Sequence, residues 1–376
     1  MHYSWDAFPG KKFPQLSGDL AADVIVIGGG VTGASAAYHL AKAGKKVALL
    51  EAETVAHGAS GKNFGMLVRG TEHDFTEAKQ AFGPRKAAAI WRQTQRVIAE
   101  IKKVVEVEKI DCDFENVGSL NVALNARERM ALRKEFDALR HAHFPAAWLE
   151  GAALSKRLHS PKVLAALFNP GDAQVSPKRF VHGLITAAAK RGASVFEQSP
   201  AIEIGGDSMG SVVRTPKGRL TAKHVFLATE TETPRAWRLP GYRTQKDFGL
   251  ITKPVSKSWC DKFWRGEELV WNFGTPYFTF RKAFGLQALF YGPTFPQAAF
   301  KKFFTDAEFK SKKSWECRIG EFDNGLPYVG QHPTKPNLLV ACGFRGHGMT
   351  LGFLSGRLIS ERVLKRKTEN FFARSR

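Results

Sequence analysis

The pattern of apolar and polar positions at the start of the chain predicts a strand, a helix and a second strand. Residues 23–27 (DVIVI) form an apolar run of strand length, which is typical of a parallel strand buried on both faces. Glycines follow, and then VTGASAAYHLAKAG, whose alanines favour a helix and whose Gly44 is a suitable stop. Because KVALLE at 46–51 is again apolar, the segment predicts one β-α-β unit.

Elements of the same kind return in the middle and at the end of the chain. Pro177 opens a helical pattern that runs to Arg191 and precedes a short strand, ASVFE. VVRTPKGRL has the turn residues of a hairpin, and HVFLAT at 224–229 is a further buried strand. Near the end, the apolar run NLLVACG at 337–343 predicts a strand, and a helix is expected from about His347.

Two blocks of different character separate these elements. Residues 85–109 and 126–142 have helical spacing around a segment with strand character, and residues 240–310 are rich in the aromatic and β-forming residues of antiparallel strands. We therefore expect a mixed α/β fold, in which a Rossmann-like nucleotide-binding domain is built from discontinuous segments and a domain with an antiparallel sheet is inserted. The first domain is expected at residues 1–75, 165–235 and 312–376, and the second at residues 76–164 and 236–311.

Length and composition suit a protein of about two domains. The chain has 376 residues, of which 43% are hydrophobic, so a core can form and global disorder is excluded. No uncharged apolar stretch approaches the ~20 residues of a membrane-spanning helix, and the N-terminus lacks the apolar segment of a signal peptide. We therefore expect a cytoplasmic protein without a transmembrane segment. The four cysteines form no C-x-x-C pair, so neither a disulfide scaffold nor a metal site is expected.

The charge balance is strongly basic, because 56 Lys and Arg residues exceed 35 Asp and Glu residues and give a net charge of +21. Such a balance can attract nucleic acid, anionic lipid or acidic small molecules, but it is also the charge of a diffusely basic surface. The sequence shows only short basic clusters, of which one lies at residues 357–376. The charge therefore leaves a nucleic-acid partner open without indicating one.

A glycine-rich turn carries the first chemical signal. The run Gly28-Gly29-Gly30-Val31-Thr32-Gly33 fits G-x-G-x-x-G, follows a predicted strand and opens a predicted helix. In this motif the first glycine permits a tight turn, the second leaves room for a pyrophosphate, and the third lets the helix approach the strand. The helix N-terminus then offers N–H groups and a positive dipole end to the phosphates. Glu51, 18 residues beyond Gly33, is suited to bind ribose hydroxyls and disfavours a 2′-phosphate.

This turn is compatible with FAD or NAD. The sequence has one such fingerprint, so a flavoprotein reduced by NAD(P)H through a second dinucleotide domain is disfavoured. If the cofactor is FAD, the electrons come from the substrate itself.

The longer segment that contains the turn, ADVIVIGGGVTGASAAYHLAKAGKKVALLEAETVAHGASGKNFG, resembles the FAD-dependent D-amino-acid oxidase superfamily. It is most similar to the glycine/sarcosine oxidase and gamma-glutamylputrescine oxidoreductase branch. Three further segments resemble the family in the right order: VSPKRFVHGLITAAAKRGASV, GRLTAKHVFLAT and FDNGLPYVGQHPTKPNLLVACGFRGHGMTLGFLSGRLI. The resemblance is weakest at 72–165 and 235–312, so it implies the fold and FAD more specifically than the substrate.

The resemblance also implies which residues surround FAD. Those of the dinucleotide motif are Gly28, Gly30, Val31, Thr32, Gly33, Glu51 and Ala52. Those beside the flavin ring are Ser60, Gly61, Asn63 and Met66, and the one on the adenine side is Ala201. The turn under the flavin comprises Gly343, Gly346, His347, Gly348, Met349 and Thr350. A helix that begins there points its positive end at the N1–C2=O edge, which is negative in reduced flavin.

This chain departs from the family at several of these positions. Phe64 stands where the family often has glycine, Met66 where it often has glutamine, and Lys62 where arginine is common. In one subgroup a cysteine near Cys317 bonds covalently to the flavin, and some relatives use a histidine in the region of His57. The spacing around Cys317 is offset by one residue, so we expect non-covalent FAD, with a covalent link through either residue as the alternative.

The substrate side carries fewer signals. Amine oxidation by FAD requires mainly that the substrate carbon faces flavin N5 and that the amine is neutral, so no catalytic acid or base is assigned. If the substrate is an amino acid, a cation should bind its carboxylate, and Arg281 resembles the family's arginine over the flavin. The alternative places Arg281 on a solvated strand face. Tyr277 and Tyr291 are expected in the same pocket, and Arg345 is near the ring by resemblance.

Three functions are compatible with the sequence. The first is FAD-dependent oxidation of a C–N bond in an amine or amino acid, with hydride transfer to flavin N5 and hydrolysis of the imine. The second is flavin-dependent modification of a tRNA base, for which the +21 charge would suit phosphate contacts. The third is flavin binding without turnover, suggested by Phe64 and Met66. The electron acceptor is open among oxygen, a quinone and a carrier protein.

Overall fold

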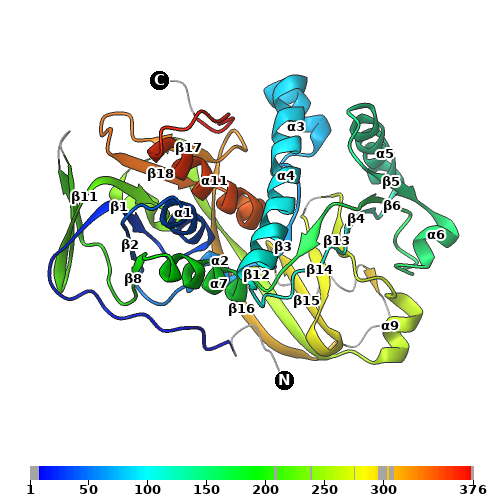
Figure 1. The fold of residues 1–376 in the computed structure, drawn as a ribbon. Coiled ribbons are helices and arrows are strands. Elements are labelled where there is room, and N and C mark those ends of the chain that lie inside the picture. Colours follow the sequence, from blue (N-terminus) through cyan, green and yellow to red (C-terminus); the bar gives the residue numbers. More distant parts are fainter. Residues whose placement is uncertain are drawn as a thin grey trace.

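Two eight-stranded sheets and the helices packed on them build a mixed α/β fold, which confirms the expected fold class (Figure 1). The computed structural model describes residues 8–206, 210–237, 239–274, 276–294, 303–304 and 309–373. Parts of two segments discussed above lie outside the described residues: 275, 295–302 and 305–308 of the aromatic block, and 374–376 of the C-terminal basic cluster.

The first sheet has a parallel centre in the order β8-β2-β1-β11-β18, with β17 antiparallel at one edge. Its strands are β1 (Leu20–Ile27), β2 (Val47–Leu50), β8 (Ser194–Phe196), β9 (Glu203–Gly206), β10 (Ser211–Thr215), β11 (Gly218–Leu227), β17 (Tyr328–Gln331) and β18 (Leu338–Cys342). The second arm of the predicted hairpin and the predicted strand HVFLAT form one continuous strand, β11, which pairs first with β10, the first arm, and then with β18. The sequence did not indicate this continuity, because polar residues separate the two apolar runs.

The apolar run of β1 is buried on both faces, as the sequence predicts. Val24 and Val26 pack in the cluster that includes the helices, and Ile25 and Ile27 pack in a second cluster on the opposite face. This alternation follows from the two-residue period of a strand. The sheet is therefore the middle layer of the first domain.

Three helices cover one face of this sheet: α1 (Val31–Lys42), α7 (Pro177–Lys190) and α11 (Gly348–Val363). The helix α1 packs against both of the others (Figure 1). A Cβ atom on Gly356 would lie 2.4 Å from the Thr32 carbonyl oxygen and 2.7 Å from the Ala36 nitrogen. Glycine at this position therefore lets α11 cross α1 at nearly backbone-to-backbone distance.

The second sheet has the order β16-β12-β15-β14-β13-β4-β6-β5 and lies on the other side of the molecule (Figure 1). Its strands are β4 (Ser119–Ala123), β5 (Ala147–Leu149), β6 (Ala165–Asn169), β12 (Tyr242–Pro254), β13 (Leu269–Asn272), β14 (Thr279–Ala283), β15 (Gln287–Gly292) and β16 (Ser311–Phe322). The helices that accompany it are α3 (Phe75–Phe82), α4 (Pro84–Glu108), α5 (Ala126–His141), α6 (Gly151–Ser155) and α9 (Lys257–Phe263). The sheet is antiparallel as expected, except that β13 and β4 are parallel.

The sheet topology differs from the expected domain division at two strands. The segments beginning at residues 165 and 312 are expected in the nucleotide-binding domain, whereas β6 pairs with β4 and β16 pairs with β12 in the second sheet. Both strands have apolar residues that suit either sheet, so their own patterns did not assign them. Short elements link the sheets: α2 (Ala59–Lys62), β3 (Met66–Leu67), β7 (Ala173–Gln174) and α8 (Thr233–Ala236).

Among the residues that the structure describes, none of the helices combines the length and the apolar composition that crossing a bilayer requires.

The close crossing of α1 and α11 predicts a large effect of one substitution. Gly356→Val would place side-chain atoms against the backbone of α1, and we expect it to lower stability by about 1–3 kcal/mol. Thermal unfolding measures the effect. Gly171→Ala is the control, because a Cβ atom there would meet nothing within 4 Å. Equal melting temperatures for the two variants would contradict the close crossing.

Candidate active site

A cavity of about 1550 Å³ collects residues from both ends of the chain and from both sheets. Most of the predicted site residues line it: Gly28, Gly30, Val31, Thr32, Glu51, Ala52, Ser60, Asn63, Met66, Ala201, Tyr277, Tyr291, Arg345, Gly346, His347, Gly348 and Met349. The glycine-rich turn after β1 and the turn before α11 therefore open onto the same space, although more than 300 residues separate them in sequence.

The turn between β1 and α1 has the geometry that the motif predicts. Gly28 has φ +111°, and a Cβ atom there would lie 2.5 Å from the Ala228 carbonyl oxygen. A Cβ atom on Gly33 would lie 2.0 Å from the Gly28 carbonyl oxygen, so this glycine permits the close turn without itself lining the cavity. The chain thus turns sharply at the carboxyl end of β1, and the N-terminus of α1 faces the cavity.

Glu51 closes one side of this turn. Its carboxylate accepts hydrogen bonds from the backbone N–H groups of Gly29 (2.7 Å) and Glu53 (2.9 Å). Burial raises the pKa of this carboxyl, and the two N–H donors oppose the increase. The side chain is thereby held at the carboxyl end of β2, where it lines the cavity beside the glycine turn.

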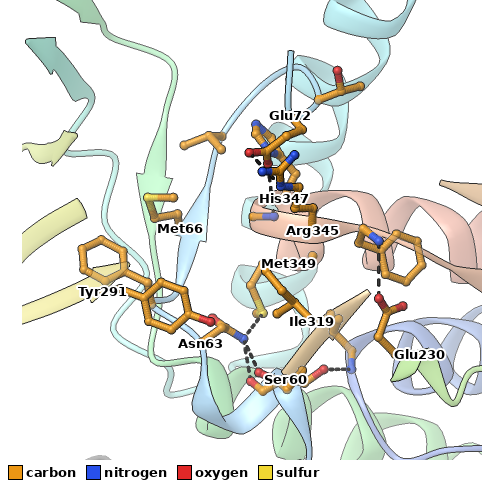
Figure 2. A pocket seen from close by; sticks show the side chains of 18 of the residues that line it. Ser60, Asn63, Met66, Glu72, Glu230, Tyr291, Ile319, Arg345, His347 and Met349 are labelled. Atoms are coloured by element: carbon orange, nitrogen blue, oxygen red, sulfur yellow. Dashed lines mark hydrogen bonds and ion pairs between the residues drawn. The ribbon is translucent and has the colours of Figure 1, made fainter. Parts of the chain in front are cut away.

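The segment that contains α2 is fixed by side-chain hydrogen bonds (Figure 2). Ser60 Oγ accepts from the Val31 N–H at 2.9 Å, and a Cβ atom on Gly30 would lie 2.8 Å from the same oxygen. Asn63 Nδ2 donates to the Ser60 carbonyl oxygen at 2.8 Å and contacts Met349 Sδ at 3.2 Å. These contacts hold the segment that contains α2 between the N-termini of α1 and α11.

The turn before α11 combines a buried neutral histidine with an ion-paired arginine. Burial, followed by the charge of Arg345, lowers the pKa of His347 to about 4, so this imidazole is neutral at neutral pH. Arg345 has φ +47° and pairs with Glu72 (Nε–Oε1, 3.1 Å) and Glu321 (Nη1–Oε2, 3.0 Å). Glu72 also accepts from the Gly346 N–H at 3.4 Å, and Figure 2 shows it beside Arg345 and His347.

Glu230 was not identified from the sequence, yet it connects three parts of the site. It follows β11 with φ +45°, and its carboxylate accepts from the N–H groups of Gly343 (3.1 Å), Phe344 (3.4 Å) and Gly320 (3.2 Å). Burial raises its pKa to about 7. No motif around Glu230 indicates its role, because its hydrogen-bond donors lie about 90 or more residues away in the sequence.

The tyrosines predicted for the substrate side lie on β15 and immediately before β14. Tyr277 donates its hydroxyl hydrogen to Asp247 Oδ2 at 2.6 Å, and Tyr291 lines the same part of the cavity. Asp247 lies on β12 and is fully buried, which raises its pKa. This part of the cavity is therefore lined by one buried and one half-buried tyrosine, and the carboxyl group of Asp247 lies behind Tyr277.

Arg281 does not reach the cavity. Its side chain is 4% exposed, and its guanidinium donates to Gln174 Oε1 (2.7 Å) and the Val175 carbonyl oxygen (3.2 Å). The Phe64 ring lies 5.6 Å from the guanidinium carbon and itself lines the cavity. The arginine is therefore neither in the pocket nor on a solvated strand face, because β7 and Phe64 enclose it.

Gly61, Gly343 and Thr350 also lie behind the lining. A Cβ atom on Gly61 would lie 1.9 Å from the Ala56 carbonyl oxygen, and the Thr350 hydroxyl accepts from the Val68 N–H at 3.1 Å. They shape the turns rather than face the cavity. Of the two residues considered for a covalent link, His57 lines the cavity and Cys317 does not.

A family model described as FAD dependent oxidoreductase matches residues 23–362. The chain belongs to this family. The resemblance inferred from the sequence is confirmed, and the chain is an FAD-dependent oxidoreductase.

Relatives of this oxidoreductase support the assignment over nearly the whole chain. It is 28% identical to gamma-glutamylputrescine oxidoreductase of Escherichia coli, over 99% of this chain and 90% of that protein. It is 28% identical to glycine oxidase of Geobacillus kaustophilus, over 92% of this chain and 94% of that protein. A crystal structure of glycine oxidase from Geobacillus kaustophilus matches with a TM-score of 0.79 and 26% identity, over 93% of this chain and 96% of the other.

One part of the oxidoreductase's cavity is rich in carboxylates and was not predicted. We call it the acidic chamber and define it by Arg69, Thr71, Glu72, Asp74, Asn121 and Glu135, all of which line the cavity. Burial raises the pKa of Asp74 to about 8, and the nearby charge of Glu135 adds to the increase. Burial also raises the pKa of Glu72 to about 7. Ionisation of Asp74 and Glu72 in the folded protein therefore costs more free energy than ionisation of the same groups in water.

The raised pKa of Asp74 predicts a pH-dependent stability. Because the folded pKa lies above the ordinary value of 3.8, the stability contributed by the protonated form is complete at low pH and is lost as the pH rises through about 8. Asp74→Asn removes this ionisation and keeps a residue suited to begin α3. We expect the melting temperature of the variant, relative to wild type, to rise by a few degrees between about pH 5 and about pH 9.

Asp137→Asn is the matched control, because Asp137 lies on the exposed side of α5 and pairs with Arg133. Its melting temperature relative to wild type should be the same at both pH values. A pH-independent difference for Asp74→Asn would show that this carboxyl is not forced to ionise in the folded protein.

Proposed function

We propose that this FAD-dependent oxidoreductase oxidises the C–N bond of an amine or amino acid. The observation that carries the proposal is that the glycine-rich turn and the turn before α11 open onto one cavity, whose far side is built by the second sheet. Bound FAD would supply a hydride acceptor for the carbon next to the substrate nitrogen. The neutral amine would become an iminium ion by loss of the hydride, this ion would release its proton to water, and the imine would hydrolyse to a carbonyl compound and an amine.

The first domain supplies the groups suited to the dinucleotide part of FAD. The N-terminus of α1 and the turn at Gly28–Gly33 are suited to the pyrophosphate, because Gly30 carries no side chain to block the approach. Glu51 is held by two backbone donors and retains acceptor capacity for a ribose hydroxyl. Ala201 lines the cavity beside the same strand ends and is assigned to the adenine side.

The N-terminus of α11 is assigned to the flavin edge. Gly346, Gly348 and Met349 line the cavity there, and the positive end of the helix favours negative charge at this point. Ser60, Asn63 and Met66 are assigned to the neighbouring side of the ring. FAD is proposed to bind without a covalent bond, because Cys317 is 1% exposed and burial raises the pKa of its thiol to about 11.

The second sheet is assigned to the substrate. Tyr277 and Tyr291 present phenol groups to the cavity, and neutral His347 presents a ring that carries no charge to repel an amine. Tyr291 is buried and Tyr277 and His347 are half-buried, so these groups limit the access of water to the reacting carbon. The relatives named gamma-glutamylputrescine oxidoreductase and glycine oxidase act on an amine and an amino acid, respectively, which supports C–N oxidation here. We propose that β6 and β16 belong to this substrate domain.

The cofactor assignment predicts the effect of a substitution in the turn. Gly30→Val would place side-chain atoms 2.8 Å or less from Ser60 Oγ and fill the space assigned to the pyrophosphate. We expect FAD affinity to fall at least about tenfold, equivalent to about 1.4 kcal/mol. Titration of the apoprotein with FAD, followed by flavin fluorescence, measures the affinity, and Gly171→Ala serves as the control. Unchanged affinity in a folded variant would refute the assignment.

The reaction is tested by anaerobic mixing of the purified holoenzyme with primary amines, N-methyl amino acids and amino acids. Loss of the visible absorbance of oxidised flavin is expected with at least one of them, and an aldehyde or keto product should form. Failure of all of them to reduce a flavin that dithionite reduces would refute C–N oxidation. Reduction by a tRNA-dependent reaction alone would instead favour the modification of a tRNA base.

A further inference from the structure

The cavity is acidic, although the protein is basic. Among the described residues that line it, eleven are Asp or Glu and five are Lys or Arg, whereas the whole chain has 35 and 56. A recessed site lined by one sign of charge concentrates ligands of the opposite sign. The cavity is therefore suited to a cation, while the surface as a whole attracts anions.

Two arginines that line the cavity near the substrate side, Arg69 and Arg345, are already paired with acceptors. Arg345 pairs with Glu72 and Glu321, and Arg69 Nη2 donates to Asn169 Oδ1 at 2.6 Å. Arg281 is enclosed by β7 and Phe64. A substrate carboxylate would have to displace an existing acceptor before Arg69 or Arg345 could bind it, and it would meet the carboxylates of the chamber.

A second observation, independent of the charges, comes from two buried polar side chains. Thr71 is 3% exposed and Asn121 is 4% exposed, and both line the cavity. The atoms Thr71 Oγ1 and Asn121 Oδ1 have no hydrogen-bond partner within the described part of the chain. Unpaired buried acceptors are costly, so a ligand donor is the expected partner. An ammonium group carries three donors and no acceptor, whereas a carboxylate offers Asn121 Oδ1 nothing.

Glu72 pairs with Arg345, whereas Asp74 and Glu135 make no ion pair with the described residues. Glu135 is committed to the N-terminus of α3, where it accepts from the N–H groups of Phe75 and Thr76 at 2.8 Å each. Burial raises the pKa of Asp74 most, and the charges of Glu135, Glu77 and Glu72 add to the increase. A bound cation between these groups would relieve the repulsion and lower the cost of ionising them.

We propose that the acidic chamber binds a second, positively charged ammonium group of the substrate, so that the enzyme oxidises a diamine or polyamine rather than an amino acid. This inference rests on the proposed C–N oxidation and names its substrate class. The reacting nitrogen lies beside His347 and Tyr291, and the distal ammonium donates to Asp74, Thr71 and Asn121. Only the carbon next to the reacting nitrogen loses a hydride, and the distal ammonium keeps its protons.

Three substrates that differ only in the distal group test the proposal. Butylamine, putrescine and gamma-aminobutyrate share a four-carbon chain and one primary amine, and their distal groups are a methyl, an ammonium and a carboxylate. The anaerobic rate of flavin reduction is measured with each on the wild-type holoenzyme at constant ionic strength. We expect the second-order rate constant for putrescine to exceed that for butylamine about tenfold, and that for gamma-aminobutyrate to be the lowest.

The chamber is tested with Asp74→Asn, which should reduce the ratio of the putrescine and butylamine rate constants several-fold. Asp137→Asn removes the same charge outside the cavity and should leave the ratio as in wild type. A second measurement does not require turnover: putrescine should raise the melting temperature of the wild-type holoenzyme more than butylamine does, and Asp74→Asn should remove the difference.

The outcomes separate this inference from the proposed function. Flavin reduction by amines with no advantage for putrescine, or with faster reaction of gamma-aminobutyrate, overturns the acidic chamber and leaves C–N oxidation standing. Reduction by none of the amines or amino acids tested overturns both. An undiminished putrescine preference in Asp74→Asn overturns the assignment of the distal ammonium to this chamber.

Discussion

The close crossing of α1 and α11 is the contact on which the site depends. A Cβ atom on Gly352 would lie 2.8 Å from Val31 Cγ1, and one on Gly356 would lie 2.4 Å from the Thr32 carbonyl oxygen. Because the two helices touch near their N-termini, both positive helix ends open onto one cavity. Asn63, which reaches Met349, extends the same contact to the segment that contains α2. A looser crossing would separate the two turns that together open onto the cavity.

This arrangement explains how a cavity rich in carboxylates can accept a cofactor with a negatively charged pyrophosphate. At the end formed by the first sheet, charge recognition is assigned to backbone N–H groups and helix termini, which need no basic side chain. At the end formed by the second sheet, side chains such as Glu72 and Asp74 set the potential. One half of the cavity is therefore suited to an anion and the other half to a cation. The net charge of +21 describes neither half.

The sequence predicted the elements whose signals are local. The unit from β1 to β2 has a buried strand, a glycine turn and a helix in one short segment, and α11 follows a turn of the same kind. It did not predict which sheet β6 and β16 would join, because pairing depends on distant strands. Arg281 illustrates the same limit: its strand was recognised, but enclosure by Phe64 and β7 depends on the tertiary structure. The place of Asn121 in the cavity was not predicted either, because no sequence motif surrounds this residue of β4.

The strand order has a consequence for the synthesis of the chain. Strand β1 lies near the start of the chain, but residues 225–227 of its neighbour β11 gain their partner β18 only when residues 338–342 have left the ribosome. Until then this part of β11 has one unpaired edge, although residues 218–222 can pair with β10, and the face of α1 that packs on α11 is exposed. A nascent or truncated polypeptide that lacks β18 and α11 thus exposes an unpaired strand edge and an apolar helix face, and its cavity lacks the residues of the turn before α11. Shortened products are consequently natural targets for chaperones and proteases.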